Sequence, residues 1–439
     1  MRRYVAIGIL GLMIAAAAGL NAVRGAEDAK RKAEEGRQEG KKEDKPEEMS
    51  CIECHRKETP GLVKQYERSA HAENHVNCQM CHQPTSDSEM GFEHYGEPVS
   101  SVVTPKRCSM CHEENYREFQ NSRHATAGEV MGSDDAYLGR KVEGMAAARV
   151  GCQKCHGSTV EIGEDGKPTS ETWPNSGVGR INPDGSKGSC TACHTRHAFE
   201  PRQARQPQTC GRCHMGPDHP DIEIYKESKH GVVYKANKDK MNLDSDSWVV
   251  GQDYAAAPTC VTCHKGATPE QESTHNVSSR MWVDLRTPIS TKNKNWKERK
   301  AAMKNVCSQC HTKGFVNNFT DQFNSVIELY NEKYAKPARR VMRELREAGK
   351  LTDKPFDEKL EWTYFELWHH EGRRARHGAA MQGPDYVQWH GFYDIAKHFY
   401  NDFIPQAEKL KPGVTDGLGR GEKNSDEAPS ASTDNSTGS

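Results

Sequence analysis

The pentad C-x-x-C-H occurs eight times between Cys51 and His311, and the eight copies use all 16 cysteines of the 439-residue chain. In this pentad two thiols can form thioethers with the vinyl groups of a porphyrin, and the adjacent histidine can bind its iron. A zinc site would not require histidine directly after the second cysteine, and a disulfide framework would not place every cysteine in one repeat. The sequence therefore predicts eight covalently attached c-type haems. In chain order, motifs 1 to 8 are Cys51/Cys54/His55, Cys78/Cys81/His82, Cys108/Cys111/His112, Cys152/Cys155/His156, Cys190/Cys193/His194, Cys210/Cys213/His214, Cys260/Cys263/His264 and Cys307/Cys310/His311.

The composition fits an interior built partly of cofactor. Only 34% of the residues are hydrophobic, which is too few for a large side-chain core, and eight apolar macrocycles would supply the missing buried surface. The net charge of −1 argues against nucleic acid or an anionic membrane surface as a partner. We expect a mainly α multihaem cytochrome c, with a loop-rich octahaem domain followed by long C-terminal helices.

Amino-acid composition and the positions of the motifs divide the chain into five parts. Residues 1–26 are typical of a signal peptide or an N-terminal anchor, and 27–49 form a charged linker with almost no apolar residues. Residues 50–312 contain all eight motifs. Residues 313–411 form a helical region, and 412–439, rich in Gly, Ser, Asp and Thr, are expected to be a disordered tail.

The N-terminus predicts export. Arg2 and Arg3 precede an uncharged run over residues 4–23, which is typical of a cleaved signal peptide and is also long enough to remain as a membrane anchor. Thioether attachment of haem is expected outside the cytoplasm. The predicted location is therefore the periplasm or an equivalent compartment, with the protein either soluble or N-terminally anchored.

After His311 apolar residues recur at helical spacing, which predicts packed helices. Pro337 and Pro355 are expected to kink or separate them. The recurring residues are Phe323, Val326, Ile327, Tyr330, Tyr334, Val341, Leu345, Leu360, Tyr364, Leu367, Trp368, Ile395, Phe399 and Phe403.

Second axial ligands must come from the 13 histidines outside the motifs, because an electron-transfer haem in such a chain generally binds two histidines. Four of these histidines share the frame S-x-H, and a fifth, His197, follows motif 5 closely enough for a turn to direct it to a neighbouring haem. The four in the shared frame are His71, His124, His230 and His275. Seven other histidines are, each taken alone, as well explained by surface or packing roles as by ligation. They are His75 and His94 in loops and His369, His370, His377, His390 and His398 in the helical region.

Directly after motif 6, Asp218 and His219 stand side by side between two prolines. A carboxylate beside an imidazole suits proton-coupled redox chemistry at an iron. Equally, His219 could be a further iron ligand, with Asp218 orienting it. The residues alone leave both interpretations open.

Three segments, WPNSGVGRINPDGSKGSCTACHTRHAF, CHMGPDHPDIEIYKESKHG and EGRRARHGAAMQGPDYVQWHGFYDIAKHF, resemble the octahaem hydroxylamine oxidoreductase family. That family includes hydrazine-oxidising and nitrite-reducing members. The resemblance runs from about residue 50 to 405. It implies that motif 4 holds the catalytic haem with an open face, that the other seven haems are bis-histidine, and that Asp218 and His219 act as proton acceptors. No C-x-x-C-K motif is present, which argues against relatives that carry one.

The resemblance also implies a homotrimer in which a tyrosine bonds covalently to the catalytic porphyrin of a neighbouring subunit. The matching segment contains Tyr386 and Tyr393, and we favour Tyr386. The chain is short for the family, and a further residue that tunes substrate choice has no obvious counterpart, although Thr320 lies in the segment where we would look for it.

The resulting hypothesis is an enzyme that oxidises hydroxylamine or hydrazine, a small nitrogenous substrate, and passes electrons through seven bis-histidine haems to a soluble or membrane cytochrome. A reductive member that converts nitrite or nitric oxide to hydroxylamine or ammonia is the first alternative. A non-catalytic electron conduit with every iron six-coordinate is the second.

Overall fold

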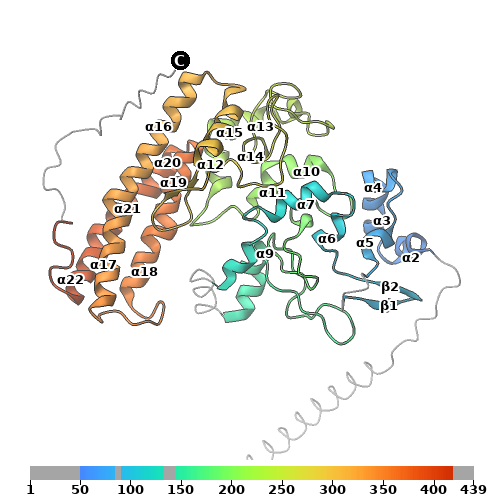
Figure 1. The fold of residues 1–439 in the computed structure, drawn as a ribbon, viewed down its shortest axis with the longest axis horizontal. Helices are drawn as coiled ribbons and strands as arrows, with labels where there is room; N and C mark the ends of the chain where they lie inside the picture. Colours follow the sequence, from blue (N-terminus) through green and yellow to red (C-terminus); the bar gives the residue numbers. More distant parts are fainter. Residues whose placement is uncertain (1–49, 85–89, 133–143, 419–439) are drawn as a thin grey trace, which may run out of the picture. The chain divides into compact units, whose positions relative to one another are not determined.

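The computed structural model describes residues 50–84, 90–132 and 144–418 (Figure 1). The predictions for the signal peptide or anchor and for the charged linker lie outside these residues. In the described part no helix is both long and apolar enough to cross a membrane. The described residues from Cys51 to residue 418 belong to one compact unit.

The fold is mainly helical, as the sequence predicted, and strand pairing within the described residues is confined to two antiparallel hairpins and isolated bridges. β1 (Phe92–His94) pairs with β2 (Glu97–Val99), and β3 (Val283–Asp284) pairs with β4 (Thr291–Lys292). Long loops connect short helices throughout the part that carries the motifs.

Motifs 1, 2, 4 and 7 have both cysteines within one helix, where residues three apart lie on the same side, so both cysteines can face one porphyrin. In the other four motifs the element ends before the second cysteine. The elements that carry motif cysteines are α2 (Cys51–Glu58), α5 (Cys78–His82), α6 (Pro105–Cys108), α9 (Cys152–His156), η2 (Cys190–Ala192), α11 (Pro207–Gly211), α14 (Cys260–His264) and α15 (Trp296–Ser308). The helices between them are α3 (Pro60–Glu67), α4 (Ala70–Glu73), α7 (Glu113–Gln120), η1 (Ala127–Gly132), α10 (Pro201–Arg205), α12 (Asp221–Glu227), α13 (Lys229–Ala236) and η3 (Lys238–Met241).

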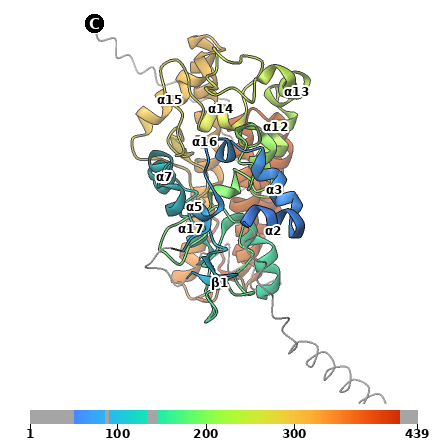
Figure 2. The same ribbon diagram turned by 90° about the vertical axis from the view of Figure 1, so that its right-hand side faces the viewer.

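The C-terminal region is a set of longer helices joined by single turns of π-helix (Figures 1 and 2). Pro337 lies in the first turn of α17, directly after one π turn, and Pro355 lies in the loop between α17 and α18. The elements are α16 (Lys313–Tyr330), η4 (Asn331–Ala335), α17 (Lys336–Glu347), α18 (Lys359–Phe365), η5 (Glu366–Glu371), α19 (Gly372–Met381), α20 (Pro384–Val387), η6 (Gln388–Tyr393), α21 (Asp394–His398), η7 (Phe399–Phe403) and α22 (Ile404–Leu410).

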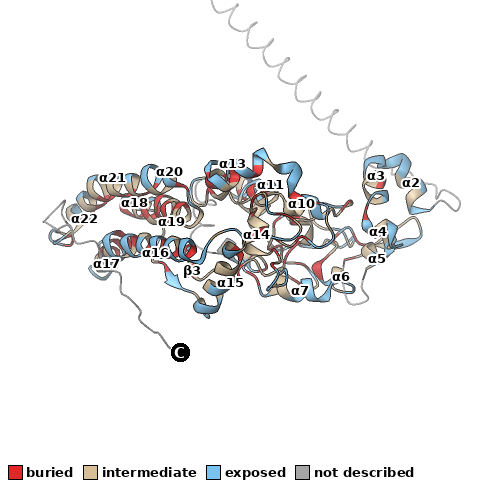
Figure 3. Ribbon diagram, turned by 90° about the horizontal axis from the view of Figure 1, so that it is seen from above, coloured by how far each residue is buried: buried red, intermediate tan, exposed pale blue. Residues whose placement is uncertain are grey.

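The largest apolar cluster lies among these helices and contains much of the predicted stripe (Figure 3). Tyr330, Val341, Ile395, Phe399 and Phe403 are all almost completely buried. The packed structure also extends past the expected boundary at residue 412, because Val414 is buried against the same cluster. Residues 412–418 are therefore part of the described structure, and the rest of the predicted tail lies outside it.

Candidate functional site

Six motif histidines face a second imidazole with ring centroids 6.1–6.4 Å apart. A metal–imidazole bond is about 2 Å long, so two histidines bound on opposite sides of one metal have ring centroids about 6 Å apart. The chain thus places these side chains at the spacing that a six-coordinate haem iron requires. The pairs are His55–His94, His71–His112, His82–His197, His124–His214, His194–His275 and His230–His311.

Several motif histidines are also oriented through Nδ1, which leaves Nε2 for a metal. Nδ1 of His82 is 2.9 Å from the carbonyl oxygen of Ser100, and Nδ1 of His214 is 2.8 Å from Oδ2 of Asp221. Opposite His214, burial and the neighbouring charges lower the pKa of His124 to about 3. His124 is therefore neutral at neutral pH, which is the form that binds iron.

All five second histidines predicted from the sequence lie opposite a motif histidine, and two of them owe their place to the serine of the S-x-H frame. Ser69 and Ser228 are N-caps of α4 and α13, and each side chain accepts a hydrogen bond from the backbone N–H three residues on. The histidine two residues after the serine then lies in the first turn of a fixed helix. The frames of His124 and His275 are not helical.

His94 is the partner that sequence reasoning did not single out. It lies on β1, where the hairpin with β2 directs it toward His55 with ring centroids 6.2 Å apart. It has no S-x-H frame. The only local signal was the turn Tyr95–Gly96, in which both residues have positive φ.

Cysteine contacts reveal how the motifs are connected. Thiols of neighbouring motifs lie within hydrogen-bonding or electrostatic range of each other. Together the contacts form one series through motifs 1, 2, 3, 5, 6, 7 and 8, with motif 4 joined to motif 6. The hydrogen-bonding pairs are Cys108–Cys190, Cys155–Cys213 and Cys210–Cys260. The pairs that act on each other only electrostatically are Cys51–Cys78, Cys81–Cys108, Cys193–Cys210 and Cys263–Cys307.

Cys54 and Cys111 are the second cysteines of motifs 1 and 3, and the structure places them differently. Cys54 is half-buried on α2, one turn after Cys51. Cys111 is exposed and lies past the end of α6, in a turn where its N–H donates to the carbonyl of Cys108. Its thiol still lies close enough to Cys81 of motif 2 to act on it electrostatically. Attachment of haem through Cys54 and Cys111, as through the other cysteines, stays a prediction.

The WPNSGVGRIN segment braces motif 4. The N–H of Val178 donates to the carbonyl of Cys155, and the N–H of Gly179 donates to that of His156. This pairing brings backbone against backbone, because a Cβ on Gly177 would lie 2.0 Å from the nitrogen of Gly157. Glycine at residue 177 is therefore required by the close approach to motif 4.

Asp218 and His219 lie beside the junction of motifs 4 and 6. Nε2 of His219 donates to the carbonyl oxygen of Cys213, 3.0 Å away, and the charge of His219 acts on the Cys155 thiol of motif 4. Nδ1 of His219 is 2.6 Å from Oδ1 of Asp218, in ion-pair contact. Nε2 of His219 is therefore committed to a carbonyl oxygen, and Nδ1 is buried beside the carboxylate of Asp218. The proton-accepting role that the resemblance implies for His219 stays a prediction.

Arg373 of α19 approaches the other oxygen of Asp218. Its Nη1 is 3.2 Å from Oδ2 of Asp218 and 2.9 Å from Nε2 of His369, and its Nη2 donates to the carbonyl of Arg286. Burial alone would raise the pKa of Asp218, but the hydrogen bond and charge of His219 and the charges of His369 and Arg373 outweigh it and hold that pKa well below its usual range. Asp218 is therefore ionised at neutral pH.

Asp221, three residues further on, holds two histidines at once. Its Oδ2 contacts His214, and its Oδ1 is 2.6 Å from Nδ1 of His377 on α19. Nε2 of His377 is buried and forms no hydrogen bond with the described residues. A nitrogen held in this way is suited to bind a metal.

The other predicted residues lie apart from this group. Tyr386 is half-buried on α20, near the carboxylates of Glu223 and Glu227 on α12, and Tyr393 on η6 is exposed. Thr320 is buried in α16 and donates to the carbonyls of Val316 and Asn317 of its own helix. None of these contacts joins them to Asp218 within the described structure.

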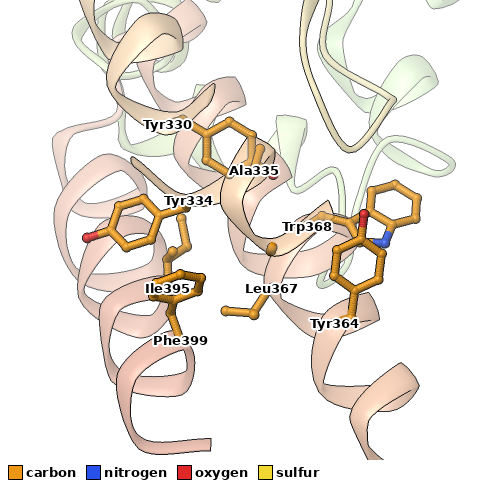
Figure 4. Close-up of a pocket in the computed structure, with 9 residues that line it drawn as sticks. Tyr330, Tyr334, Ala335, Tyr364, Leu367, Trp368, Ile395 and Phe399 are labelled. Atoms are coloured by element: carbon orange, nitrogen blue, oxygen red, sulfur yellow. The ribbon is translucent and has the colours of Figure 1, made fainter. Parts of the chain in front are cut away.

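An apolar void of about 10 Å³ lies among the C-terminal helices (Figure 4). Its walls include Tyr330, Tyr334, Leu367 and Phe399. A space of this size holds at most one water molecule, and an apolar lining disfavours even that. It is a packing defect and is not a candidate substrate site.

Comparison with protein families matches two descriptions. "Seven times multi-haem cytochrome CxxCH" matches residues 182–357, and "Cytochrome c7 and related cytochrome c" matches residues 137–215. The chain is a multihaem cytochrome c. Its histidine pairs and connected cysteines fit this assignment.

Relatives of this cytochrome include a "Probable nitrite reductase-hydroxylamine oxidoreductase fusion protein" of Kuenenia stuttgartiensis, 28% identical over 252 residues. The match covers 49% of this chain and 25% of that protein, so the chain spans about a quarter of its length. Among solved structures, a "Hypothetical multiheme protein" superposes with a TM-score of 0.72 at 25% identity, covering 82% of this chain and 94% of that one. A chain of the Kuenenia stuttgartiensis "reducing HAO-like protein complex" shares the fold, with a TM-score of 0.62 at 20% identity and coverage of 82% and 84%.

Proposed function

We propose that this cytochrome is an octahaem oxidoreductase that oxidises hydroxylamine or hydrazine at motif 4 and passes the electrons to a cytochrome acceptor. A haem at motif 4 would supply an iron that binds the nitrogen substrate and accepts its electrons. The observation that carries the proposal is the contact of Cys155 with Cys213, because it sets His219 and Asp218 beside motif 4.

Asp218 and His219 would manage the protons that leave an N–H substrate together with its electrons. Nε2 of His219 faces a carbonyl oxygen and therefore carries a hydrogen, so Nδ1 is the atom that gains or loses a proton. The ionised carboxylate of Asp218, 2.6 Å away, stabilises the protonated ring. Arg373 keeps that carboxylate ionised and oriented.

The six imidazole pairs support bis-histidine ligation at motifs 1, 2, 3, 5, 6 and 8. We assign His377 to motif 7, because the carboxylate that holds it also acts on His264. Electrons from motif 4 would then enter the series of motifs at motif 6. From motif 6 they could pass through motifs 5, 3 and 2 to motif 1, or through motif 7 to motif 8.

The test is Asp218→Asn. Loss of the carboxylate should lower kcat/KM for hydroxylamine by about 10²- to 10⁴-fold, the usual contribution of a positioned acid or base. The matched control is Asp246→Asn, a change at an exposed aspartate. Unchanged turnover in Asp218→Asn would refute the role of this residue in proton transfer.

Nitrite reduction is the second candidate. The guanidinium of Arg373 lies beside Asp218 and carries a permanent positive charge, which suits an anionic substrate. The fusion relative is also named for nitrite reductase as well as hydroxylamine oxidoreductase. Steady-state assays with both substrates decide the direction: turnover of nitrite with a reduced electron donor, without hydroxylamine oxidation, would favour the reductive enzyme.

We further propose a homotrimer in an extracytoplasmic compartment, in which Tyr386 bonds to the haem at motif 4 of a neighbouring subunit. The position of Tyr386 on a short, half-buried helix allows contact with another chain. Mass spectrometry of the denatured protein should show two peptides joined through haem. Tyr386→Phe should abolish this species and Tyr393→Phe should not, whereas the reverse result would assign Tyr393.

A further inference from the structure

Positive charge is concentrated around motif 8. Between residues 292 and 313 the chain contains seven lysines and arginines and one carboxylate, Glu298, although its net charge is −1. The seven form what we call the basic patch: Lys292, Lys294, Lys297, Arg299, Lys300, Lys304 and Lys313. This excess of positive charge within one short segment produces a local positive electrostatic field, although the chain as a whole is nearly neutral.

The cations of the basic patch remain largely uncompensated. Lys292, Lys294, Lys297 and Lys313 are exposed, and among the described residues no carboxylate oxygen lies within 4.0 Å of any of the seven. Burial and the charges of Lys304 and Lys292 lower the pKa of Lys300, whereas Asp321 of α16 acts in the opposite sense. The patch therefore lacks the ion pairs that neutralise most charged helix faces.

Trp296 organises the edge of the patch. Nζ of Lys292 lies 4.1 Å and Nζ of Lys297 lies 5.7 Å from the centroid of the Trp296 ring. Lys292 precedes α15 in the chain, and Lys297 belongs to its first turn. Cation–π contacts of this kind stabilise a lysine while leaving its ammonium group in contact with solvent. The two charges are thus presented at a fixed place.

Motif 8 begins on α15, the helix that carries four of the seven patch residues, and reaches the surface. Cys307 belongs to α15, Cys310 is exposed, and the three residues that follow His311 are exposed as well. The half-exposed ring of Phe315 stacks on the ring of His311 with centroids 4.7 Å apart. Motif 8 is also an end of the connected series of motifs, where an electron must enter or leave the chain.

We propose that the basic patch is the docking surface for an acidic electron-carrier protein that exchanges electrons at motif 8. In each encounter one electron passes between the carrier and the motif-8 haem, so that one is oxidised as the other is reduced and no further reactant is needed. Complementary charge raises the rate of productive encounter and selects the partner. The inference requires a haem at motif 8 but not the chemistry proposed at motif 4, so each can fail without the other.

The test compares two triple variants of the haem-loaded protein with the same change in net charge. One is Lys292→Glu, Lys294→Glu and Lys297→Glu in the patch. The control is Lys350→Glu, Lys354→Glu and Lys359→Glu, three exposed lysines of which two lie in the connection from α17 to α18 and the third begins α18. Reduced flavodoxin, a small acidic carrier, is mixed with the oxidised protein, and haem reduction is followed by stopped-flow absorbance.

At low ionic strength the patch variant should react about tenfold or more slowly than wild type, and its rate should lose most of its dependence on salt. The control variant should stay close to wild type. Binding of oxidised flavodoxin, measured by calorimetry, should weaken in the patch variant alone. With a basic cytochrome in place of flavodoxin, the patch variant should react faster than wild type, which a merely misfolded protein would not do.

Equal slowing in both triple variants, or none in either, would overturn the proposal. So would patch-dependent binding to vesicles of anionic lipid or to single-stranded RNA together with unchanged flavodoxin kinetics, because the patch would then serve a different class of partner.

Discussion

At the residue scale, the assignment of His94 rests on one distance, the 6.2 Å between its ring centroid and that of His55. Replacing His94 by Ala removes the imidazole opposite motif 1 and should convert one low-spin ferric haem to high spin. Electron paramagnetic resonance of the oxidised protein measures this change.

The matched control is His75→Ala, because His75 is an exposed histidine outside the motifs, in the segment between motifs 1 and 2. Its spectrum should equal that of wild type. A low-spin spectrum in His94→Ala, with no new high-spin component, would remove His94 from the set of ligands.

The difference between His94 and the predicted histidines shows what the sequence could reveal at this scale. For His71 and His230 a serine N-cap fixes a short helix, so the local sequence carries the information. For His94 the position depends on the pairing of β1 with β2 and on how that hairpin packs against α2. That arrangement is non-local, and the local sequence marks only the turn Tyr95–Gly96 that joins the two strands.

Arg373 is a positioning residue whose effect can be separated from simple loss of structure. In Arg373→Gln the cation beside Asp218 is lost, so the pKa of Asp218 should rise toward its usual range, although the hydrogen bond and charge of His219 still hold it down. Ionised Asp218 is the active form. As the pH is lowered, the variant should therefore lose activity at a higher pH than wild type does. The pH profile of kcat/KM measures the shift.

Arg373→Lys keeps the positive charge and should restore most of the pH profile of kcat/KM. Because lysine lacks the rigid, planar donor group of arginine, KM should stay higher than in wild type. The control is Arg374→Gln on the same helix, which loses an ion pair with Asp394 and none with Asp218. An identical acid limb in wild type and Arg373→Gln would show that Arg373 does not act on Asp218.

At the element scale, the segment that braces motif 4 depends on glycine. In Gly177→Ala the new Cβ would lie 2.0 Å from the backbone nitrogen of Gly157, and the atoms it meets belong to backbone that cannot move aside. The chain must shift at motif 4, which should destabilise the fold by about 1–3 kcal/mol. Thermal unfolding followed at a haem absorbance band measures the loss.

Gly314→Ala is the control, because a Cβ at this residue of α16 meets no atom within 4 Å. It should be neutral or stabilising by up to about 1 kcal/mol, since alanine favours the helix. Equal stability of the two variants would mean that the segment around residue 177 does not hold motif 4.

The C-terminal helices show how far periodicity predicts an element. The spacing of Ile395, Phe399 and Phe403 correctly indicated one buried face. It did not indicate that π turns interrupt these helices, because a repeat of four residues fits the wider turn as well as the α-helical one. Which turn forms is decided by packing between helices, as where η5 contacts α21.

At the scale of the whole molecule, apolar side chains are distributed unevenly. The largest buried cluster belongs to the C-terminal helices and includes Tyr330, Leu345 and Phe403, whereas the part that carries most motifs contains only small clusters, such as the one around Trp248 and Tyr254. Porphyrins must therefore contribute much of the interior around the motifs. Haem attachment and folding should be coupled there and less so in the C-terminal helices.

This uneven core predicts how the chain behaves when expressed without haem attachment. Residues 313–411 should retain part of their amide protection in hydrogen exchange, because their helices bury their own apolar faces. Residues 51–312 should exchange almost completely, since short helices such as α9 are unstable in isolation. The haem-loaded protein should protect both parts. Uniform protection along the haem-free chain would show that side chains alone suffice for the motif-bearing part, and uniform loss would show that the C-terminal helices also depend on the haems.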